Sequence, residues 1–275
     1  MRDWGPGGRN YSEPVRGIAG GNPSFTADDG SADPAVSRAL AAYAACQGSE
    51  RAALAALTAG RLLVPVVAVA RGEPPAPGTD LPVRPDLEHA GGGNGREGAR
   101  AGLGDKSSEM ALPTLIGLDG RRAIPAFTCL DAMRRWRQDA RPVPARALDV
   151  WQAAAGDSCA VIIDVGGPVP LAVEGARLAA LSRGEPPPEA WADADVREAV
   201  ASALSGELEV SAFGLHPGGD EGSEVDEDLV VELHLVPGRA AADVSELAAR
   251  VAGAVLDQLG GRLRRGVAIW LGTGR

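Results

Sequence analysis

The sequence predicts an α/β (α+β) fold with two small modules, each a mixed sheet covered by helices. Apolar residues make up 45% and charged residues 23% of the 275 residues, which is the ordinary range for globular proteins. Helix-like and strand-like apolar patterns alternate along the chain. Three prolines at 186–188 begin a stiff linker, predicted over residues 186–192. We therefore place one module in residues 31–185 and another in residues 193–275.

The first module begins with two predicted helices. Asp33 followed by Pro34 is an N-cap with proline in the first turn, so a helix begins there and runs to about Cys46. Ser49 caps a second helix, which Gly60 closes. Both helices have apolar residues at helical spacing, so each is expected to bury one face.

A valine-rich strand follows over residues 61–70, where Pro65 removes a hydrogen-bond donor and predicts an edge or a bulge. Residues 71–105 are rich in Pro, Gly and charge without apolar periodicity, which predicts a disordered insertion. Residues 1–30 have the same character and predict a disordered tail. Residues 93–98 match the glycine spacing of dinucleotide-binding loops, but they lie inside the insertion with no strand before them, so we predict no cofactor.

The pair Asp119-Gly120 is the strongest hairpin signal in the chain, and it predicts that two strands, 111–118 and 122–127, pair around this turn. The remaining elements predicted for the first module are a helix, a buried strand, a neighbouring strand and a helix, at residues 144–155, 159–165, 169–173 and 176–182.

A short helix with a basic outer face follows the hairpin. Thr128 and Asp131 form a capping box at its start. Its surface holds arginines interrupted by an aromatic residue: Arg134, Arg135, Trp136 and Arg137. Arginine and aromatic residues are enriched at protein interfaces, so we predict that these four residues bind a protein partner. An ordinary solvated helix face is the alternative.

The second module is predicted to run helix, strand, strand, helix, strand. An acidic loop joins the first two strands, and Asp243 and Glu246 form a capping box for the last helix. The acidic loop lacks the spacing of a calcium-binding loop, so no metal site is predicted there. The predicted elements of this module lie at residues 193–204, 208–215, 229–236, 243–259 and 267–271.

No spacing typical of a catalytic motif or a zinc site is present. None of the three histidines forms a metal-spacing pair with another histidine or a cysteine. Cys129 directly follows the predicted N-cap, where the helix dipole favours a reactive thiolate, although a small buried side chain is the simpler interpretation. We therefore expect no catalytic, cofactor-binding or metal-binding residues.

The net charge of −10 argues against general affinity for nucleic acid or an anionic membrane, because both need a cationic surface. The longest apolar run, residues 62–70, is far shorter than a membrane-spanning helix requires. No signal-peptide pattern is found at the start of the chain. Three widely spaced cysteines fit reduced thiols. We expect a cytoplasmic protein.

Several runs in the first module resemble a known family. The clearest is Leu-Pro-Thr-Leu-Ile-Gly-Leu-Asp-Gly at 112–120, which continues through Ile-Pro-Ala-Phe-Thr at 124–128 to Met-Arg-Arg-Trp at 133–136. Over about residues 33–185 the chain resembles the N-terminal domain of the enhanced serine sensitivity protein SseB family, in its actinobacterial form. The resemblance implies an α/β fold and a non-enzymatic role, and it transfers no catalytic residue. The insertion at 71–105 departs from the family pattern.

Together these observations favour a non-catalytic interaction or regulatory protein whose basic helix meets a protein partner. Three alternatives stay open: an enzyme or sensor that uses Cys129, a small-ligand binder with a cleft between the modules, and a homo-oligomer.

Overall fold

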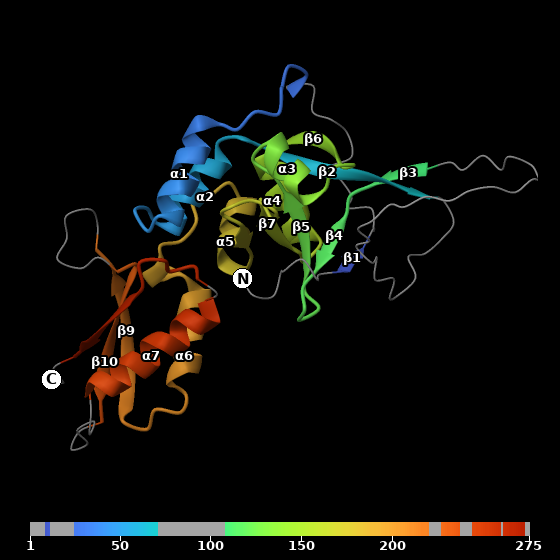
Figure 1. Cartoon of the computed structure of the whole chain (residues 1–275). Helices are drawn as coiled ribbons and strands as arrows, with labels where there is room; N and C mark the ends of the chain where they lie inside the picture. The colour runs from blue at the N-terminus through green and yellow to red at the C-terminus, as the bar shows by residue number, and fades with distance from the viewer. Residues whose placement is uncertain are drawn as a thin grey trace, which may run out of the picture.

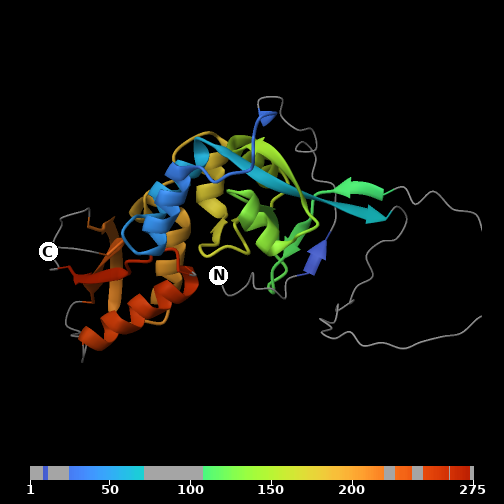
Figure 2. The same ribbon diagram turned by 45° about the horizontal axis from the view of Figure 1, so that its top comes forward.

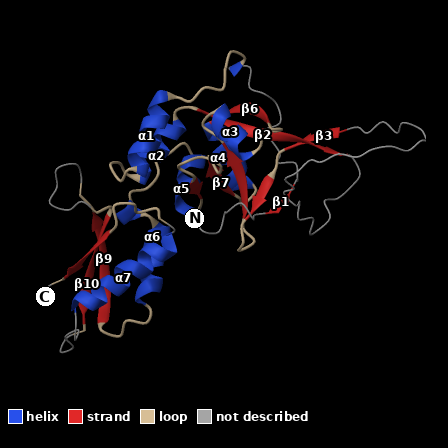
Figure 3. Ribbon diagram, viewed as in Figure 1, coloured by secondary structure: helices blue, strands red, loops and turns tan. Residues whose placement is uncertain are grey.

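The computed structural model describes residues 9–11, 25–70, 108–219, 227–236, 244–259 and 261–272. They form two modules, each with sheets that helices cover, so the predicted α/β (α+β) class is confirmed (Figures 1 and 3). The predicted insertion at 71–105 lies outside the described residues, as does Asp243 of the predicted capping box.

In the described part of the first module there are five α-helices: α1 (Pro34–Ala44), α2 (Glu50–Thr58), α3 (Leu130–Trp136), α4 (Ala147–Gly156) and α5 (Gly175–Ser182). Its described strands are β1 (Arg9–Tyr11), β2 (Arg61–Ala70), β3 (Ser108–Ala111), β4 (Thr114–Ile116), β5 (Arg122–Ala126), β6 (Arg141–Arg146), β7 (Ala160–Ile163) and β8 (Leu171–Val173). The second module contains a 3-10 turn at Ala190–Ala192, α6 (Ala194–Leu204), β9 (Val210–Pro217), β10 (Leu229–Leu235), α7 (Val244–Leu259) and β11 (Val267–Leu271).

Local capping bonds are found at the start of α1, α2 and α6, which begin where the sequence predicts. The Asp33 carboxylate accepts hydrogen bonds from the first-turn amides of α1, and Ser49 caps α2 in the same way. Asp193 caps α6 by accepting a hydrogen bond from the Asp195 amide.

Two stretches of the predicted tail, 9–11 and 25–30, are structured, since β1 pairs with β4 and Asp28 forms an ion pair with Arg61.

The main sheet of the first module has the strand order β1-β4-β5-β7-β8. Its β4–β5 pair is the predicted antiparallel hairpin, and Gly120 in the turn adopts a φ of +83°, which glycine tolerates best. Strands β5 and β7 are parallel, so their carboxyl ends lie at the same edge of the sheet. Chain segments that follow the two strands therefore meet there, which is where α/β proteins commonly place their sites.

Strand β2 is the middle strand of a second sheet in the order β3-β2-β6, but beside Pro65 only β6 is paired, so the predicted edge position holds at this residue. Pro65 lies opposite Pro142, and the partner on the other side of β2, strand β3, pairs only from Val67 onward. Neither proline therefore has to donate a backbone hydrogen bond to a neighbouring strand. Figure 2 shows β2 and β3 projecting together from the module.

The helix predicted over residues 144–155 begins later than expected. Residues up to Arg146 belong to β6, which pairs with β2 along its whole length, and α4 begins at Ala147. Strand pairing with a distant segment overrides the local helix-start signal of Pro144.

The core of the first module lies between the main sheet and four helices, α1, α2, α4 and α5. Alternation along β7 shows the layers: Val161 and Ile163 face these helices, whereas Ala160 and Ile162 face the opposite side. Helix α3 lies on that opposite side, where Trp136 packs against Ala160 and Ile162 and their cluster. The first module thus has a thick helical layer on one face and α3 on the other.

The second module is a three-stranded sheet in the order β11-β10-β9, with α6 and α7 on one face (Figure 1). Strand β10 is antiparallel to β9 and parallel to β11. Leu229, Val231 and Leu233 of β10 point into this core, while Glu232 and His234 lie on the other face. Within the described residues, no helix combines the length and apolar character that crossing a membrane would require.

Candidate functional site

The carboxyl ends of β5 and β7 are joined by a buried aspartate. Asp164 directly follows β7 and is 6% exposed. It accepts a hydrogen bond from the Thr128 amide at 2.9 Å and another from the Thr128 hydroxyl at 2.7 Å. Burial raises the pKa of the Asp164 carboxyl, although the two bonds from Thr128 and the charge of Arg135 oppose the shift. The Asp164 carboxyl therefore fixes the segment that leads into α3.

This arrangement corrects the predicted capping box of α3. The Thr128 side chain is turned toward Asp164, and the N-cap residue is Cys129, which makes no side-chain capping bond. The first-turn amide of Leu130 donates instead to the carbonyl oxygen of Gly30 at 2.8 Å. A tertiary hydrogen bond has thus replaced the local one that the sequence predicts.

Cys129 is half-buried against the small cluster that includes Phe127 and Met133. The two described histidines, His216 and His234, lie on β9 and β10 of the second module, and His216 is hydrogen-bonded to Glu232 at 2.8 Å. In the part of the chain that the structure describes, Cys129 therefore has no neighbouring histidine that could act as its base.

The predicted partner-binding residues divide into two kinds. Arg134 and Arg135 are exposed, and neither forms a hydrogen bond or an ion pair with a described residue. Arg137 lies beyond the helix end and pairs with Asp139 at 2.7 Å. Trp136 stacks on Phe127, with ring centroids 5.4 Å apart. The structure thus leaves two free guanidinium groups on a helix that its aromatic residue anchors.

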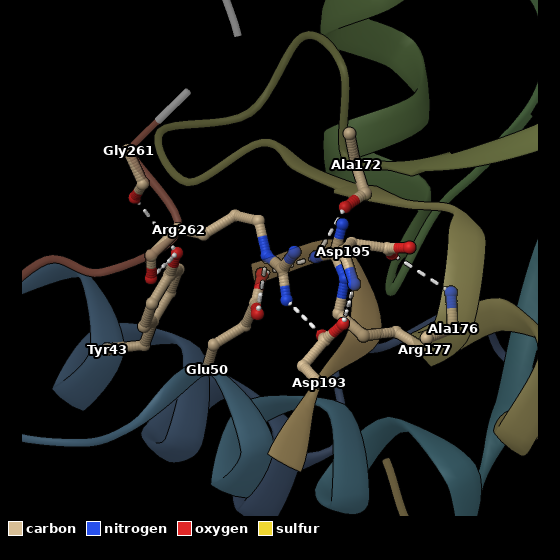
Figure 4. Close-up of polar contacts among 9 residues, drawn as sticks. All are labelled: Tyr43, Glu50, Ala172, Ala176, Arg177, Asp193, Asp195, Gly261 and Arg262. Carbon is tan, nitrogen blue, oxygen red and sulfur yellow. Dashed lines mark hydrogen bonds and ion pairs between the residues drawn. The ribbon is translucent and has the colours of Figure 1, made fainter. Parts of the chain in front are cut away.

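A second candidate site lies where the two modules meet, and sequence reasoning missed its residues (Figure 4). Four charged side chains form a buried network: Glu50 of α2, Arg177 of α5, Asp193 before α6 and Arg262 before β11. Exposed fractions of these side chains range from 0% for Asp193 to 13% for Arg262. The network is balanced, with two positive and two negative charges.

Arg262 connects the two negative charges. Its Nε atom donates to Glu50 at 3.2 Å and its Nη2 atom donates to Asp193 at 2.5 Å. Arg177 donates from Nη1 to Glu50 and to the carbonyl oxygen of Ala172. Such close pairing is needed to offset the desolvation of four buried ions.

Two further contacts fix the junction. The Tyr43 hydroxyl of α1 lies 3.2 Å and 3.1 Å from the carbonyl oxygens of Gly261 and Arg262, to which it donates. Burial, together with the charge of Glu50, raises the pKa of Tyr43 to about 12. Asp195 of α6 accepts a hydrogen bond at 2.9 Å from the Ala176 amide at the start of α5.

A signal for this site is present in the sequence but is easily missed. Arg177 lies between apolar residues on the buried face of α5, where a charged side chain is expected only with a partner. The partner comes from residue 50, which no local pattern connects to residue 177. Among the described residues, no group of three or more histidine, cysteine, aspartate or glutamate side chains is placed to hold a metal ion.

These features define a class of protein: a two-module α+β protein in which a mixed sheet supports a short basic helix, and buried ion pairs join the modules. The chain belongs to the SseB family, since the family model described as the SseB protein N-terminal domain matches residues 36–180. This range includes the main sheet from β4 to β8, α3 and Arg177. No curated protein and no solved structure matches the chain.

Proposed function

We propose that this SseB-family protein is a non-catalytic interaction or regulatory protein and that α3 binds a protein partner. The observation that supports the proposal best is the pair of exposed arginines, Arg134 and Arg135, neither of which forms an ion pair with a described acidic group. Arginine is a favoured interface residue because its planar group donates several hydrogen bonds at once.

The helix that presents these arginines is held in place by contacts on its buried side. Trp136 packs on Phe127, and the backbone of Gly166 lies directly against the backbone of Trp136. Asp164 fixes the segment before the helix through Thr128. A surface that is already ordered loses little conformational entropy on binding, which favours affinity.

Charge points to an acidic partner surface. The chain has a net charge of −10, so two unpaired arginines on one helix contrast with the rest of the molecule. Local charge complementarity of this kind steers association and suppresses wrong partners. We further propose a cytoplasmic setting, in which the free thiols of Cys46, Cys129 and Cys159 persist in reduced form.

Affinity purification with the full chain, followed by titration of each captured protein, tests this proposal. We expect Arg134→Glu and Arg135→Glu each to lower the affinity for the partner by about tenfold or more, as is typical of an interfacial arginine. Arg38→Glu is the matched control, because Arg38 is also exposed and without a described partner but lies on α1. The same partners and affinities for all three variants would remove α3 from consideration.

A further inference from the structure

Arg177 is buried but incompletely paired. It is 3% exposed, and both of its hydrogen bonds come from the single atom Nη1. Its Nε atom is fully buried and has no hydrogen-bond partner among the described residues, and its Nη2 atom donates to none of them either. Unsatisfied donors on a buried charged group are costly, and native structures normally give them a partner.

A cavity of about 430 Å³ lies beside this guanidinium group. We call it the junction cavity; its walls come from both modules and include Glu174, Arg177, Asp195, Glu198, Ser202 and Arg262. Pockets for small molecules typically begin at about 300 Å³. The volume is therefore large enough for a small ligand, and Arg177 lines the cavity with Nη2 as its unpaired donor that is not fully buried.

The other charged groups of the cavity wall differ in whether they already have an ion-pair partner. Arg262 is paired with Glu50 and Asp193, and Glu174 is paired with Arg121. Glu198 is exposed and has no described partner. The junction cavity thus offers the Nη2 donor of Arg177 and, on α6, the free carboxylate of Glu198.

Asp195 adds a second carboxylate beside Glu198. One of its oxygens accepts the Ala176 amide hydrogen bond, and it approaches α5 so closely that a Cβ atom on Gly175 would lie 2.0 Å from Asp195 Oδ2. Gly175 also has a φ of +58°, so glycine is required there. Asp195 therefore lies in the cavity wall, and the hydrogen bond from a neutral amide leaves its negative charge in place.

We propose that the junction cavity binds a small zwitterion. Its carboxylate accepts a hydrogen bond from Nη2 of Arg177, and its ammonium group lies at the carboxylates of Asp195 and Glu198. A simple anion would accept the hydrogen bond from Arg177 Nη2 but would meet the repulsion of the acidic wall, whereas a simple cation would leave Nη2 unpaired. Because the cavity wall comes from both modules, bound ligand also stabilises the junction.

Calorimetric titration of the full chain tests this inference with four probes. Two are zwitterions of different length, L-alanine and 4-aminobutanoate, and two have a single charge, butanoate and butylammonium. We expect at least one zwitterion to bind saturably and about tenfold more tightly than either single-charge probe, since it adds a charge-assisted contact. Binding of neither zwitterion, or equal binding of a single-charge probe, would overturn the proposal.

Variants on the exposed wall of α6 locate the binding without disturbing the buried network. We expect Ser202→Trp to obstruct the cavity and abolish binding, and Glu198→Gln to weaken the zwitterion but not butanoate. Ala201→Trp is the matched control, because Ala201 is exposed on the same helix but does not line the cavity. Unchanged binding by Ser202→Trp would refute the assigned site. Arg134→Glu should leave this binding intact, so the result is independent of the role proposed for α3.

Discussion

The Thr128 hydroxyl donates a hydrogen bond to Asp164 at 2.7 Å, although 36 residues separate the two along the chain. The bond ties the ends of two parallel strands together just before α3 begins. Asp164 has a φ of +49°, a backbone region that aspartate and asparagine adopt more readily than other side chains. One short buried residue thus meets both a conformational and a hydrogen-bonding requirement.

We expect the difference in stability between Asp164→Asn and the native protein to depend on pH. Burial raises the pKa of this carboxyl above its ordinary value of 3.8, so the folded state binds more protons than the unfolded state between 3.8 and the raised pKa. Its contribution to stability is therefore present below the unfolded pKa and is lost as the pH rises through the folded pKa. Asparagine keeps the backbone conformation but does not titrate. We expect urea unfolding between pH 3.5 and 7 to show the variant gaining stability relative to the native sequence as pH rises; a difference independent of pH would contradict this.

Gly166→Ala tests how tightly the base of α3 is packed. A Cβ atom at Gly166 would lie 2.9 Å from the Trp136 backbone nitrogen, so the backbone must shift. We expect a loss of about 1–3 kcal/mol in the free energy of unfolding, as overpacking usually costs. Gly156→Ala at the end of α4 is the control, because nothing lies within 4 Å of the added atom, and it should be neutral or slightly stabilising. Equal stability of the two variants would show that the backbone of α3 shifts at little cost in free energy.

The parts of the fold that the sequence predicts well are those with local causes. Asp33, Ser49 and Asp193 cap helices because their own side chains reach the first-turn amides, which a pattern three residues long reveals. The turn at Asp119-Gly120 is equally local. Where a distant segment competes, the prediction fails: Pro144 belongs to β6 because β2 pairs with it.

The same distinction between local and distant causes explains which candidate site the sequence reveals. The arginines of α3 are adjacent in sequence, so their cluster is visible without a structure. The junction network joins residues 50, 177, 193 and 262, whose proximity depends on how two modules pack. The one local hint is the charged Arg177 on an apolar helix face, and it indicates that a partner exists without identifying it.

Thiol alkylation of the folded protein separates the proposed binding role from a thiol-dependent one. Cys46 is exposed, Cys129 is half-buried and Cys159 is buried. Because reaction requires access, we expect iodoacetamide at neutral pH to modify Cys46 first, then Cys129, and Cys159 last. Peptide mass mapping over time gives the order, and urea-unfolded protein, in which all three should react alike, is the control. Cys129 reacting faster than Cys46 would favour a thiol-dependent enzyme or sensor.

Arg262→Met should separate the stabilities of the two modules. The substitution keeps much of the side-chain volume but leaves the fully buried carboxylate of Asp193 without its ion pair, and it removes one of the two arginines paired with Glu50. Breaking a buried pair from one side typically costs about 3–5 kcal/mol. Because the lost pair with Glu50 joins the modules, we expect calorimetry to show one thermal transition for the native chain and two for the variant.

Arg250→Met is the matched control for this experiment. Arg250 also forms ion pairs with two acidic residues, Glu207 and Glu246, but its side chain is 48% exposed and all three residues lie within the second module. Water and salt screen such pairs, so the control should unfold as the native chain does. If Arg262→Met retained one transition at the native temperature, the ion-pair network would not couple the modules, and the contacts of Tyr43 and Asp195 would have to hold the junction.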